Sequence, residues 1–471
     1  MKPIADFQPE EEGGIAAKNS NETLLVTHFV TIPERLAAII NALYRLMWPL
    51  GCIAMFTVQE DTSMKRVRLT FTISLTLVLV LLLSSAPGAF ANPTGPTAVS
   101  NDPFERAASY LKTHDVPESA LQVPAGMQVI GTGLNNGRDI IVGPDGGLYI
   151  AENGSGNPAN CEEIFPDFEA CVGDTGSVTR IENGVQERIA TGLPSWGDSS
   201  GFGTSGPAGI TWSPREGFYL TIGLGFGLSP DDLAAIDPVG QWFGSVARMN
   251  PNGYWNIQAD IYDYEATQNP DDGEVDSNPY GLVTIQGRTR VVADAGGNDL
   301  LKVNNNGVVS TLTVFPDTLV PAPPFLGLPP GAMIPMQAVP TSVTPGPDNT
   351  LYAGQLTGFP FPVGGANVFQ VWPNGYTQVK ASGFSAIVDI TTGPDGSLYV
   401  LEFAHDQLAC ETMGVCDGRL TKVDAGGGKT LLANNLPYPG GVAVANDGTI
   451  YLTLFSIFPD FAGGGQVVRL N

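Results

Sequence analysis

The sequence predicts an all-β fold, a six-bladed β-propeller in which each blade is a four-stranded antiparallel sheet. The chain carries 58 glycines and 38 prolines in 471 residues, a density that favours short strands and tight turns over long helices. A turn motif of the Gly-Pro-Asp-Gly kind, followed by an apolar strand, returns six times, as blade repeats do. The helical periods that a TIM barrel or a doubly wound sheet requires between strands are almost absent.

The turn motif marks the first hairpin of each predicted blade. Its copies are GPDGGLYI at 143–150, SPREGFYL at 213–220, QGRTRVVA at 286–293, GPDNTLYA at 346–353, GPDGSLYV at 393–400 and ANDGTIYL at 445–452. A further strand follows each copy. Four of these strands run into an Asn-Gly dipeptide, at Asn183-Gly184, Asn252-Gly253, Asn306-Gly307 and Asn374-Gly375. Asn-Gly adopts positive φ easily and closes hairpins, so it predicts the turn between the third and fourth strands.

The two ends of the repeat region predict how the ring closes. The chain stops after a third strand, GQVVRL at 465–470, whereas MQVIGTGL at 127–134 is a fourth-strand copy with no unit before it. We therefore expect the N-terminal strand to complete the last blade, which removes the free edges of an open sheet.

The connections between strands predict two unlike faces. The turns between first and second strands and between third and fourth strands are tight, and they share one face. The remaining connections emerge on the other face and are long: 152–175, 193–207, 222–243, 260–279, 315–336, 354–365 and 403–417. Long loops on a rigid scaffold are where binding and chemistry usually lie. We call this side the looped face and expect the function there.

Residues 64–91 predict export. They combine a basic start, an apolar stretch and the small-x-small sequence Ala89-Phe90-Ala91, as a signal peptide cleaved after Ala91 does. A membrane anchor is the weaker interpretation, because the apolar run is too short to span a bilayer and ends at a Pro-Gly pair.

The predicted signal peptide begins at an internal methionine, Met64, and it divides the chain into a segment before it and two segments after it. We interpret residues 1–63 as a mis-assigned start or a pre-region outside the fold; the alternative is a genuine pre-region with a membrane helix over 36–56. Residues 92–125 read as a Pro-rich leader with one short helix, and residues 126–471 form the propeller. A secreted or extracytoplasmic product starting at Asn92 follows.

The charge balance restricts the partners. The chain has 22 Lys and Arg against 47 Asp and Glu, a formal net charge of −25, whereas binding phosphates requires clustered basic side chains. We therefore expect no nucleic acid partner, and no membrane partner after signal cleavage. We expect a monomer that binds a small molecule or a protein on its looped face.

Four cysteines follow the predicted cleavage site as two close pairs, Cys161/Cys171 and Cys410/Cys416. An even, locally paired set in an exported chain predicts two disulfides. A metal site is the weaker interpretation, because neither pair has the two-residue spacing that zinc sites favour.

Aligned repeats place acidic side chains in two columns. Asp139 and Asp389 lie four positions before the Gly-Pro turn, on strands predicted to line the central channel. A second column, at the ends of second strands in the first, third and fifth units, holds Glu152, Asp294 and Glu402, with Asn298, Asp299 and His405 close by. All eight are candidate binding residues at the channel mouth.

The five carboxylates of these columns allow two interpretations. Oxygen ligands that converge on a channel mouth suit Ca²⁺ or another divalent cation, with Asp139, Asp389, Glu152, Asp294 and Glu402 as ligand candidates. Alternatively, the acids accept backbone N–H groups of the long loops and fix their shape. We favour the second interpretation, because six-fold geometry places second-strand residues well off the axis.

Two further stretches bear on function. Residues 315–343 and 354–365 combine prolines with apolar side chains and predict a stiff apolar wall on the looped face. It either receives an aromatic or apolar ligand or packs on itself as a cap, which we favour slightly. Residues 197–201 match G-x-S-x-G but lie in a Gly/Ser loop rather than the strand–turn–helix that this motif requires. No catalytic residue is predicted.

The looped-face segments resemble the ScyD/ScyE family of exported proteins. The residues that carry the resemblance are VDSNPYGL (275–282), ADAGGNDLLKVN (293–304), PPFLGLPPG (323–331), IPMQAVPTSV (334–343) and GQLTGFPFPVGGANV (354–368). The family is similar to six-bladed NHL- and TolB-like propellers, and the resemblance covers about 125–471. It implies an extracytoplasmic propeller; it carries over no catalytic residue and no activity.

Two hypotheses of function follow. The first is a non-catalytic accessory propeller that binds a small molecule or protein through the looped face, because histidine is scarce and no catalytic constellation is evident. The second is a metal-dependent, lactonase-like hydrolase with an acidic site at the channel mouth. Propellers serve both roles, so the fold alone does not decide between them.

Overall fold

The computed structural model describes residues 55–61, 66–72, 122–165, 168–201, 203–405, 417–460 and 463–470. The chain divides into two units, 1–73 and 74–471. In the first unit, β1 (Met55–Asp61) and β2 (Arg66–Thr72) pair as an antiparallel hairpin. The predicted cleavage site after Ala91, the predicted leader helix, and Cys410 and Cys416 lie outside the described residues.

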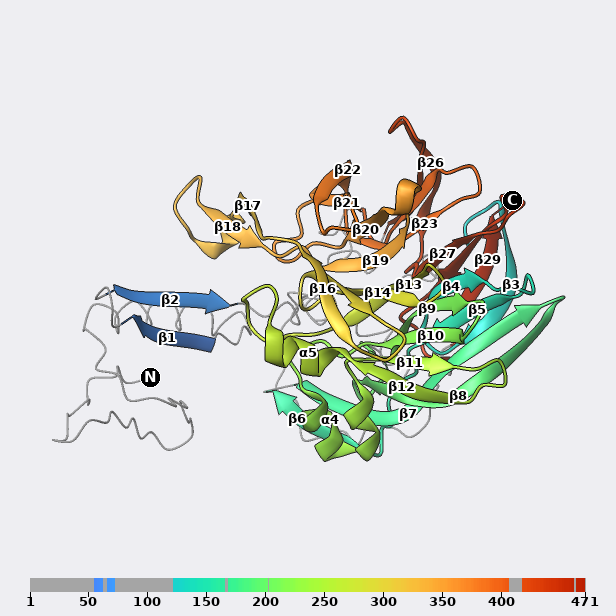
Figure 1. Cartoon of the computed structure of the whole chain (residues 1–471), viewed down its shortest axis with the longest axis horizontal. Coiled ribbons are helices and arrows are strands. Elements are labelled where there is room, and N and C mark those ends of the chain that lie inside the picture. Colours follow the sequence, from blue (N-terminus) through green and yellow to red (C-terminus); the bar gives the residue numbers. More distant parts are fainter. Residues whose placement is uncertain are drawn as a thin grey trace, which may run out of the picture. The chain divides into compact units, whose positions relative to one another are not determined.

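The second unit confirms the predicted propeller: it contains six blades of four antiparallel strands (Figure 1). Blades 1 to 3 are β4 (Gly137–Val142), β5 (Leu148–Glu152), β7 (Phe168–Glu182), β8 (Val185–Gly197); β9 (Pro207–Ser213), β10 (Gly217–Ile222), β11 (Ser245–Met249), β12 (Trp255–Asp260); and β13 (Pro279–Ile285), β14 (Thr289–Asp294), β15 (Asp299–Val303), β16 (Val309–Val314). Blades 4 to 6 are β19 (Pro340–Pro345), β20 (Leu351–Gln355), β21 (Ala366–Val371), β22 (Thr377–Phe384); β23 (Ile387–Thr392), β24 (Leu398–Glu402), β25 (Gly418–Val423), β26 (Lys429–Leu436); and β27 (Gly441–Val444), β28 (Ile450–Leu454), β29 (Gly465–Leu470), β3 (Met127–Leu134). The first strands of successive blades contact one another around the centre.

The ring closes as predicted. The N-terminal strand β3 pairs antiparallel with the last strand of the chain, β29, with Met127 opposite Leu470 and Leu134 opposite Gly465. Blade 6 is therefore built from both ends of the repeat region, which leaves no open edge between the first and last blades.

The predicted tight turns form because their residues tolerate positive φ. Asn183 and Gly184 have φ of 51° and 77°, the combination that closes a two-residue hairpin without splaying its strands. At the equivalent turn of blade 2, Gly253 has φ of 84°, and a Cβ there would lie 1.8 Å from the Ile189 carbonyl oxygen of blade 1. Gly253 therefore lets the outer hairpin of blade 2 pack directly against the backbone of blade 1.

The core lies between neighbouring blades. Side chains from facing sheets interlock there; the rings of Tyr149 (blade 1) and Phe218 (blade 2) are 4.4 Å apart, and Trp212 lies 4.6 Å from Phe218. Trp196 and Leu233 are fully buried in the same cluster. Burying these large apolar surfaces is the main stabilising contribution to the ring.

Four of the predicted long connections contain regular structure. In 222–243 are α4 (Pro230–Ile236) and the 3₁₀ turn η3 (Pro238–Trp242), in 260–279 is α5 (Ile261–Gln268), and in 315–336 are β17 (Thr318–Pro321), η4 (Pro324–Leu326) and β18 (Met333–Met336). A further 3₁₀ turn, η5 (Pro347–Asn349), lies in the tight turn of blade 4. The fourth is the long connection 152–175, in which β6 (Cys161–Phe165) pairs with an extended β7 as a fifth strand of blade 1.

Candidate functional site

The two channel carboxylates hold neighbouring blades together. Asp139 on β4 accepts hydrogen bonds from its own strand at Ile140 N (2.7 Å) and from Ile210 N of blade 2 (2.9 Å). Asp389 on β23 accepts from Val442 N of blade 6 (2.7 Å) and from Ser342 Oγ of blade 4 (2.7 Å). The first strands of neighbouring blades belong to separate sheets and are not paired with each other. Each aspartate side chain therefore accepts a backbone N–H of the neighbouring blade's first strand and links the two sheets.

The channel is narrow and acidic. Asp139, Asp389 and Tyr280 line a cavity of about 190 Å³ between the first strands. Burial raises the pKa of Asp389 to about 6. Burial and the nearby charge of Asp389 raise the pKa of Asp139 well above its usual value. Two carboxylates that share a small cavity resist ionising together.

The second-strand carboxylates follow one rule in blades 1, 3 and 5. Each accepts the backbone N–H of a residue just before the first strand of its own blade: Asn135 N to Glu152 Oε2 (2.5 Å), Asn278 N to Asp294 Oδ1 (2.6 Å) and Ser385 N to Glu402 Oε1 (2.7 Å). A carboxylate at this position therefore fixes the connection that enters its blade. All three contacts are of the kind favoured from the sequence, in which an acidic side chain accepts a backbone N–H of a long loop and fixes the shape of that loop.

Each of these carboxylates also has a second partner. Arg188 Nη2 lies 3.1 Å from Glu152 Oε2, and Thr179 Oγ1 donates to Glu152 Oε1. His405 Nδ1 lies 3.0 Å from Glu402 Oε1. Asp294 accepts from Ser277 Oγ (2.7 Å) and from the backbone of the following turn. Charge-assisted bonds of this kind make burial of an ionised carboxylate tolerable.

The predicted channel-mouth residues therefore fall into separate groups. Asp139 and Asp389 lie together at the channel, whereas Glu152, Asp294 and Glu402 lie in three alternate blades, each with its own loop. Among the described residues, no three His, Cys, Asp or Glu side chains are arranged to hold a metal ion.

Asn298 and Asp299 lie with Asp294 at the looped end of blade 3. Asn298 has φ of 52° and spans two connections: its Nδ2 donates to Asp271 Oδ2 (3.1 Å) and its Oδ1 accepts from Val339 N (3.1 Å). Asp299 begins β15 and is fully buried. Its surroundings include Glu265 on α5 and Asp271 and Asp276 in the next loop, three acids that repeat alignment did not select.

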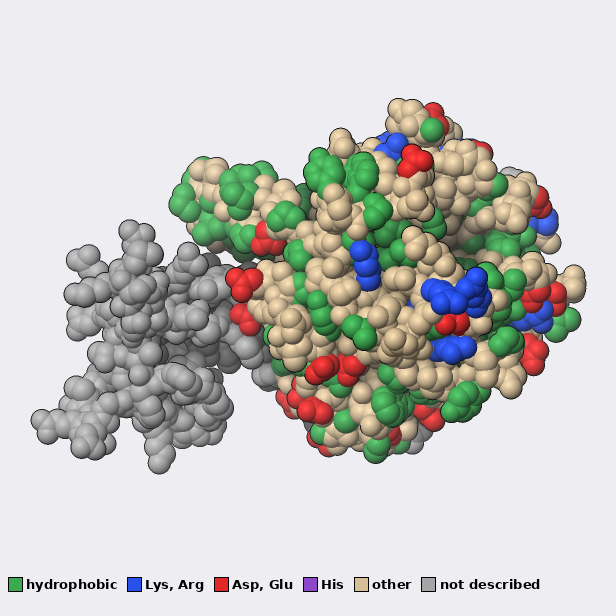
Figure 2. Space-filling model, in the orientation of Figure 1, with side chains coloured by type: hydrophobic (Ala, Val, Ile, Leu, Met, Phe, Trp, Pro, Cys, Tyr) green, Lys and Arg blue, Asp and Glu red, His purple; other side chains and the backbone are tan. Residues whose placement is uncertain are grey.

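The predicted apolar wall is largely exposed. The β17–β18 hairpin projects from the propeller, and apolar side chains cover it (Figures 1 and 2). Leu319 and Phe325 are 65% and 64% exposed; Leu328 and Met333 are also exposed, as is Val363 in the neighbouring connection. A self-packed cap, slightly favoured from the sequence, therefore describes only the inward-facing side chains of this segment and not its exposed apolar ones.

The base of the wall is well anchored. Val320 and Met336 are buried, one on each strand of the hairpin. Phe325 contacts Phe359 with ring centroids 6.1 Å apart, and Phe359 contacts Phe361 at 6.0 Å. The hairpin and the 354–365 connection are thus joined by aromatic contacts, as expected from their shared apolar composition.

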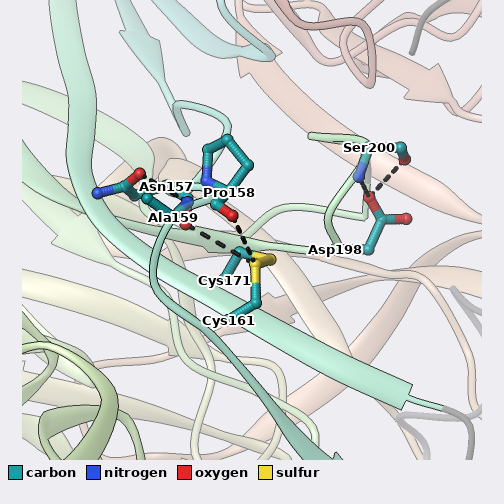
Figure 3. The surroundings of a disulfide bond; sticks show 7 residues. All are labelled: Asn157, Pro158, Ala159, Cys161, Cys171, Asp198 and Ser200. Carbon is teal, nitrogen blue, oxygen red and sulfur yellow. Dashed lines mark hydrogen bonds between the residues drawn. A yellow bond between two sulfur atoms is a disulfide. The ribbon is translucent and has the colours of Figure 1, made fainter. Parts of the chain in front are cut away.

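The first predicted disulfide is confirmed. Cys161 and Cys171 face each other across β6 and β7 and are bonded (Figure 3). Close to it, Asp198 Oδ1 accepts from Ser200 N (2.8 Å) and from Ser200 Oγ (2.5 Å). These bonds shape a turn, so the G-x-S-x-G match is part of loop structure here and forms no nucleophile elbow.

No helix in the described part of the chain is long and apolar enough to cross a membrane.

Comparisons with known proteins find similar solved structures at low sequence identity. No family model matches the chain, and no curated protein matches it. Among solved structures, a streptogramin B lyase is similar at 14% identity over 73% of this chain and 97% of that one, with a TM-score of 0.40. A gluconolactonase from Xanthomonas campestris is similar at 10% identity over 75% and 93%, with a TM-score of 0.43. These neighbours are six-bladed β-propeller proteins.

Proposed function

We propose that this protein is an extracytoplasmic, ScyD/ScyE-like binding propeller that engages an apolar small molecule or protein through its looped face. The single observation that carries the proposal is the exposed apolar surface of the β17–β18 hairpin and its connecting turn, where Leu319 and Phe325 are 65% and 64% exposed. Contiguous apolar side chains on the surface of a soluble protein are typical of interaction sites.

The backbone of the wall suits it for recognition. Its prolines limit the freedom that binding would otherwise remove, and the hydrogen bond from Val339 N to Asn298 Oδ1 (3.1 Å) fixes its end to blade 3. The apolar side chains are thus held in place before a partner arrives.

A ligand screen tests this role. Purified protein is screened by thermal shift against aromatic and apolar small molecules, and hits are quantified by calorimetry. The double variant Leu319→Ser/Phe325→Ser should lose the hits. Val185→Ser is the matched control, because Val185 is 66% exposed on the tight-turn side. Hits that survive the double variant, or a screen without hits, would count against the wall as the binding surface.

A second candidate is the lactonase-like hydrolase, favoured by one observation: Asp139 and Asp389 have raised pKa values and face the same cavity. Of the five metal-ligand candidates expected from the sequence, Asp139 and Asp389 line this cavity, whereas Glu152, Asp294 and Glu402 each lie with the connection of their own blade. We expect no esterase or lactonase turnover with Ca²⁺ or Zn²⁺ added. Turnover that disappears in Asp139→Asn would replace the binding proposal with the enzymatic one.

Export is the cellular part of the proposal. Mass spectrometry of the exported product should find Asn92 at the N-terminus, because the small-x-small sequence ends at Ala91. A product that keeps residue 1 would refute both the cleavage site and the reading of residues 1–63.

A further inference from the structure

Five carboxylates surround the looped end of blade 3. They come from α5 (Glu265), from the loop that follows it (Asp271 and Asp276), from the end of β14 (Asp294) and from the start of β15 (Asp299). Within the described residues none of the five forms an ion pair with Lys, Arg or His. The group concentrates negative charge where the connection from blade 2 meets blade 3.

Three of the five have ordinary structural partners. Asp294 accepts from Asn278 N and Ser277 Oγ. Asp271 accepts from Gly273 N (2.8 Å), and Asp276 accepts from Gly227 N (3.2 Å). Their carboxylates shape the surrounding loops, as the strand-end acids of the other blades do.

The other two, Glu265 and Asp299, have none. Their side chains lie in residues that are 1% and 0% exposed, and no hydrogen-bond partner for any of their four carboxylate oxygens is found among the described residues. A buried carboxylate without donors or a counter-charge is strongly unfavourable. Something must therefore neutralise the pair.

Glu265 is directed into this group by the shape of the backbone. A Cβ on Gly297 would lie 3.1 Å from Glu265 Oε2 and 3.6 Å from the carboxyl carbon of Asp294. The missing side chain at Gly297 thus leaves room for the Glu265 carboxylate beside Asp294. Asp299, two residues further along, is close enough to feel the charges of Glu265, Asp294 and Asp271.

We propose that Glu265 and Asp299 bind a hard divalent cation, calcium or magnesium, at the looped end of blade 3. Oxygen-only ligands are the preference of both ions. Glu265 and Asp299 would supply two carboxylate ligands, and water and backbone carbonyls would complete the coordination. The ion would tie α5 to β15, and this proposal is independent of the binding role of the apolar wall.

The test uses the full chain, freed of metal by chelation. Ca²⁺ and Mg²⁺ are titrated separately by calorimetry, with metal content per chain measured after desalting and Tm followed against ion concentration. The variants are Glu265→Gln and Asp299→Asn, which keep shape and remove charge. Asp263→Asn is the matched control, because its side chain is exposed on the same helix.

One equivalent of ion and a rise in Tm are expected for the wild type and for Asp263→Asn. Affinity should fall by more than about 100-fold in each of the two site variants, beyond the roughly 10- to 100-fold that the loss of an outer-shell partner costs. The site variants should also fold without ion at least as stably as the metal-free wild type, which separates lost binding from misfolding. The proposal would be overturned if the wild type bound no ion, or if Glu265→Gln and Asp299→Asn bound it as tightly as the wild type does. Protons would then be the species that neutralises the two carboxylates.

Discussion

The entrances to blade 1 and blade 3 contain buried carboxylates of two kinds. At blade 1, Glu152 is buried with a guanidinium, a hydroxyl and a backbone N–H as partners. At blade 3, Glu265 and Asp299 are buried to the same degree, and their oxygens lack partners within the described residues. Burial and acidity alone therefore do not identify a site; the supply of hydrogen-bond donors separates a structural carboxylate from a ligand.

The largest expected effect is on stability, at the structural carboxylate Glu152 of blade 1. Glu152→Ala should lower the free energy of unfolding by about 3 kcal/mol, because it leaves the buried Asn135 N without its acceptor and removes the buried carboxylate that pairs with Arg188. Glu187→Gln, an exposed carboxylate on β8, is the control. Urea unfolding measures both, and a loss near zero for Glu152→Ala would remove the distinction between the two kinds of carboxylate.

The second effect is a pH dependence. Burial and the nearby Asp294 raise the pKa of Glu265 to about 8, and burial raises that of Asp389 to about 6. A raised carboxyl pKa stabilises the folded state below the unfolded value, and this contribution is lost as pH rises through the folded value. Between pH 5 and 8, in chelated buffer, stability should fall by on the order of a few kcal/mol.

Carboxyls with lowered pKa do not mask this slope. Lys422 lowers the pKa of Asp395 to about 2, so its contribution is lost only in strong acid, below the window. Thermal unfolding in chelated buffer at several pH values, repeated with excess Ca²⁺, measures the effect. Stability that rises between pH 5 and 8 without the ion would contradict the raised pKa values.

The smallest effect has the opposite sign to the first. Glu265→Gln should raise the stability of the metal-free protein at pH 8 by about 1 kcal/mol, because it removes a charge that lacks compensation. Saturating Ca²⁺ should abolish or reverse this difference, because only the wild type gains from the ion. A variant that is destabilised with and without the ion would place Glu265 among the structural carboxylates.

The repeat pattern predicts the fold in detail. Local turn chemistry sets blade number, closure and the strand ends: β5, β14 and β24 stop at Glu152, Asp294 and Glu402, the residues that alignment of repeats selects. Hairpins of this kind depend on residues that are close together in the sequence, so they can be predicted from one sequence alone.

The acids that lie outside the repeats are harder to predict. Glu265 belongs to a short helix inside a connection that differs from every other blade, so alignment of repeats does not reach it. Its relation to Asp299 depends on the packing of α5 against blade 3 and on Gly297. The acidic stretch 260–276, with Asp260, Asp263, Glu265, Asp271, Asp272, Glu274 and Asp276, was the available signal.

The apolar wall shows the same division. Its composition predicts an apolar surface, but whether Leu319 and Phe325 pack inward or outward depends on the β17–β18 pairing, which projects the tip away from the blades (Figure 2). Pro-rich apolar sequence is compatible with both arrangements.

One calcium titration compares the two kinds of carboxylate most directly. Calorimetry is run on the metal-free wild type, on Glu265→Gln and on Glu152→Gln under the same conditions. We expect one ion to bind to the wild type and to Glu152→Gln, and binding to be lost in Glu265→Gln. Binding that disappears in Glu152→Gln and persists in Glu265→Gln would contradict the assignment of Glu265 as a ligand and Glu152 as a structural carboxylate.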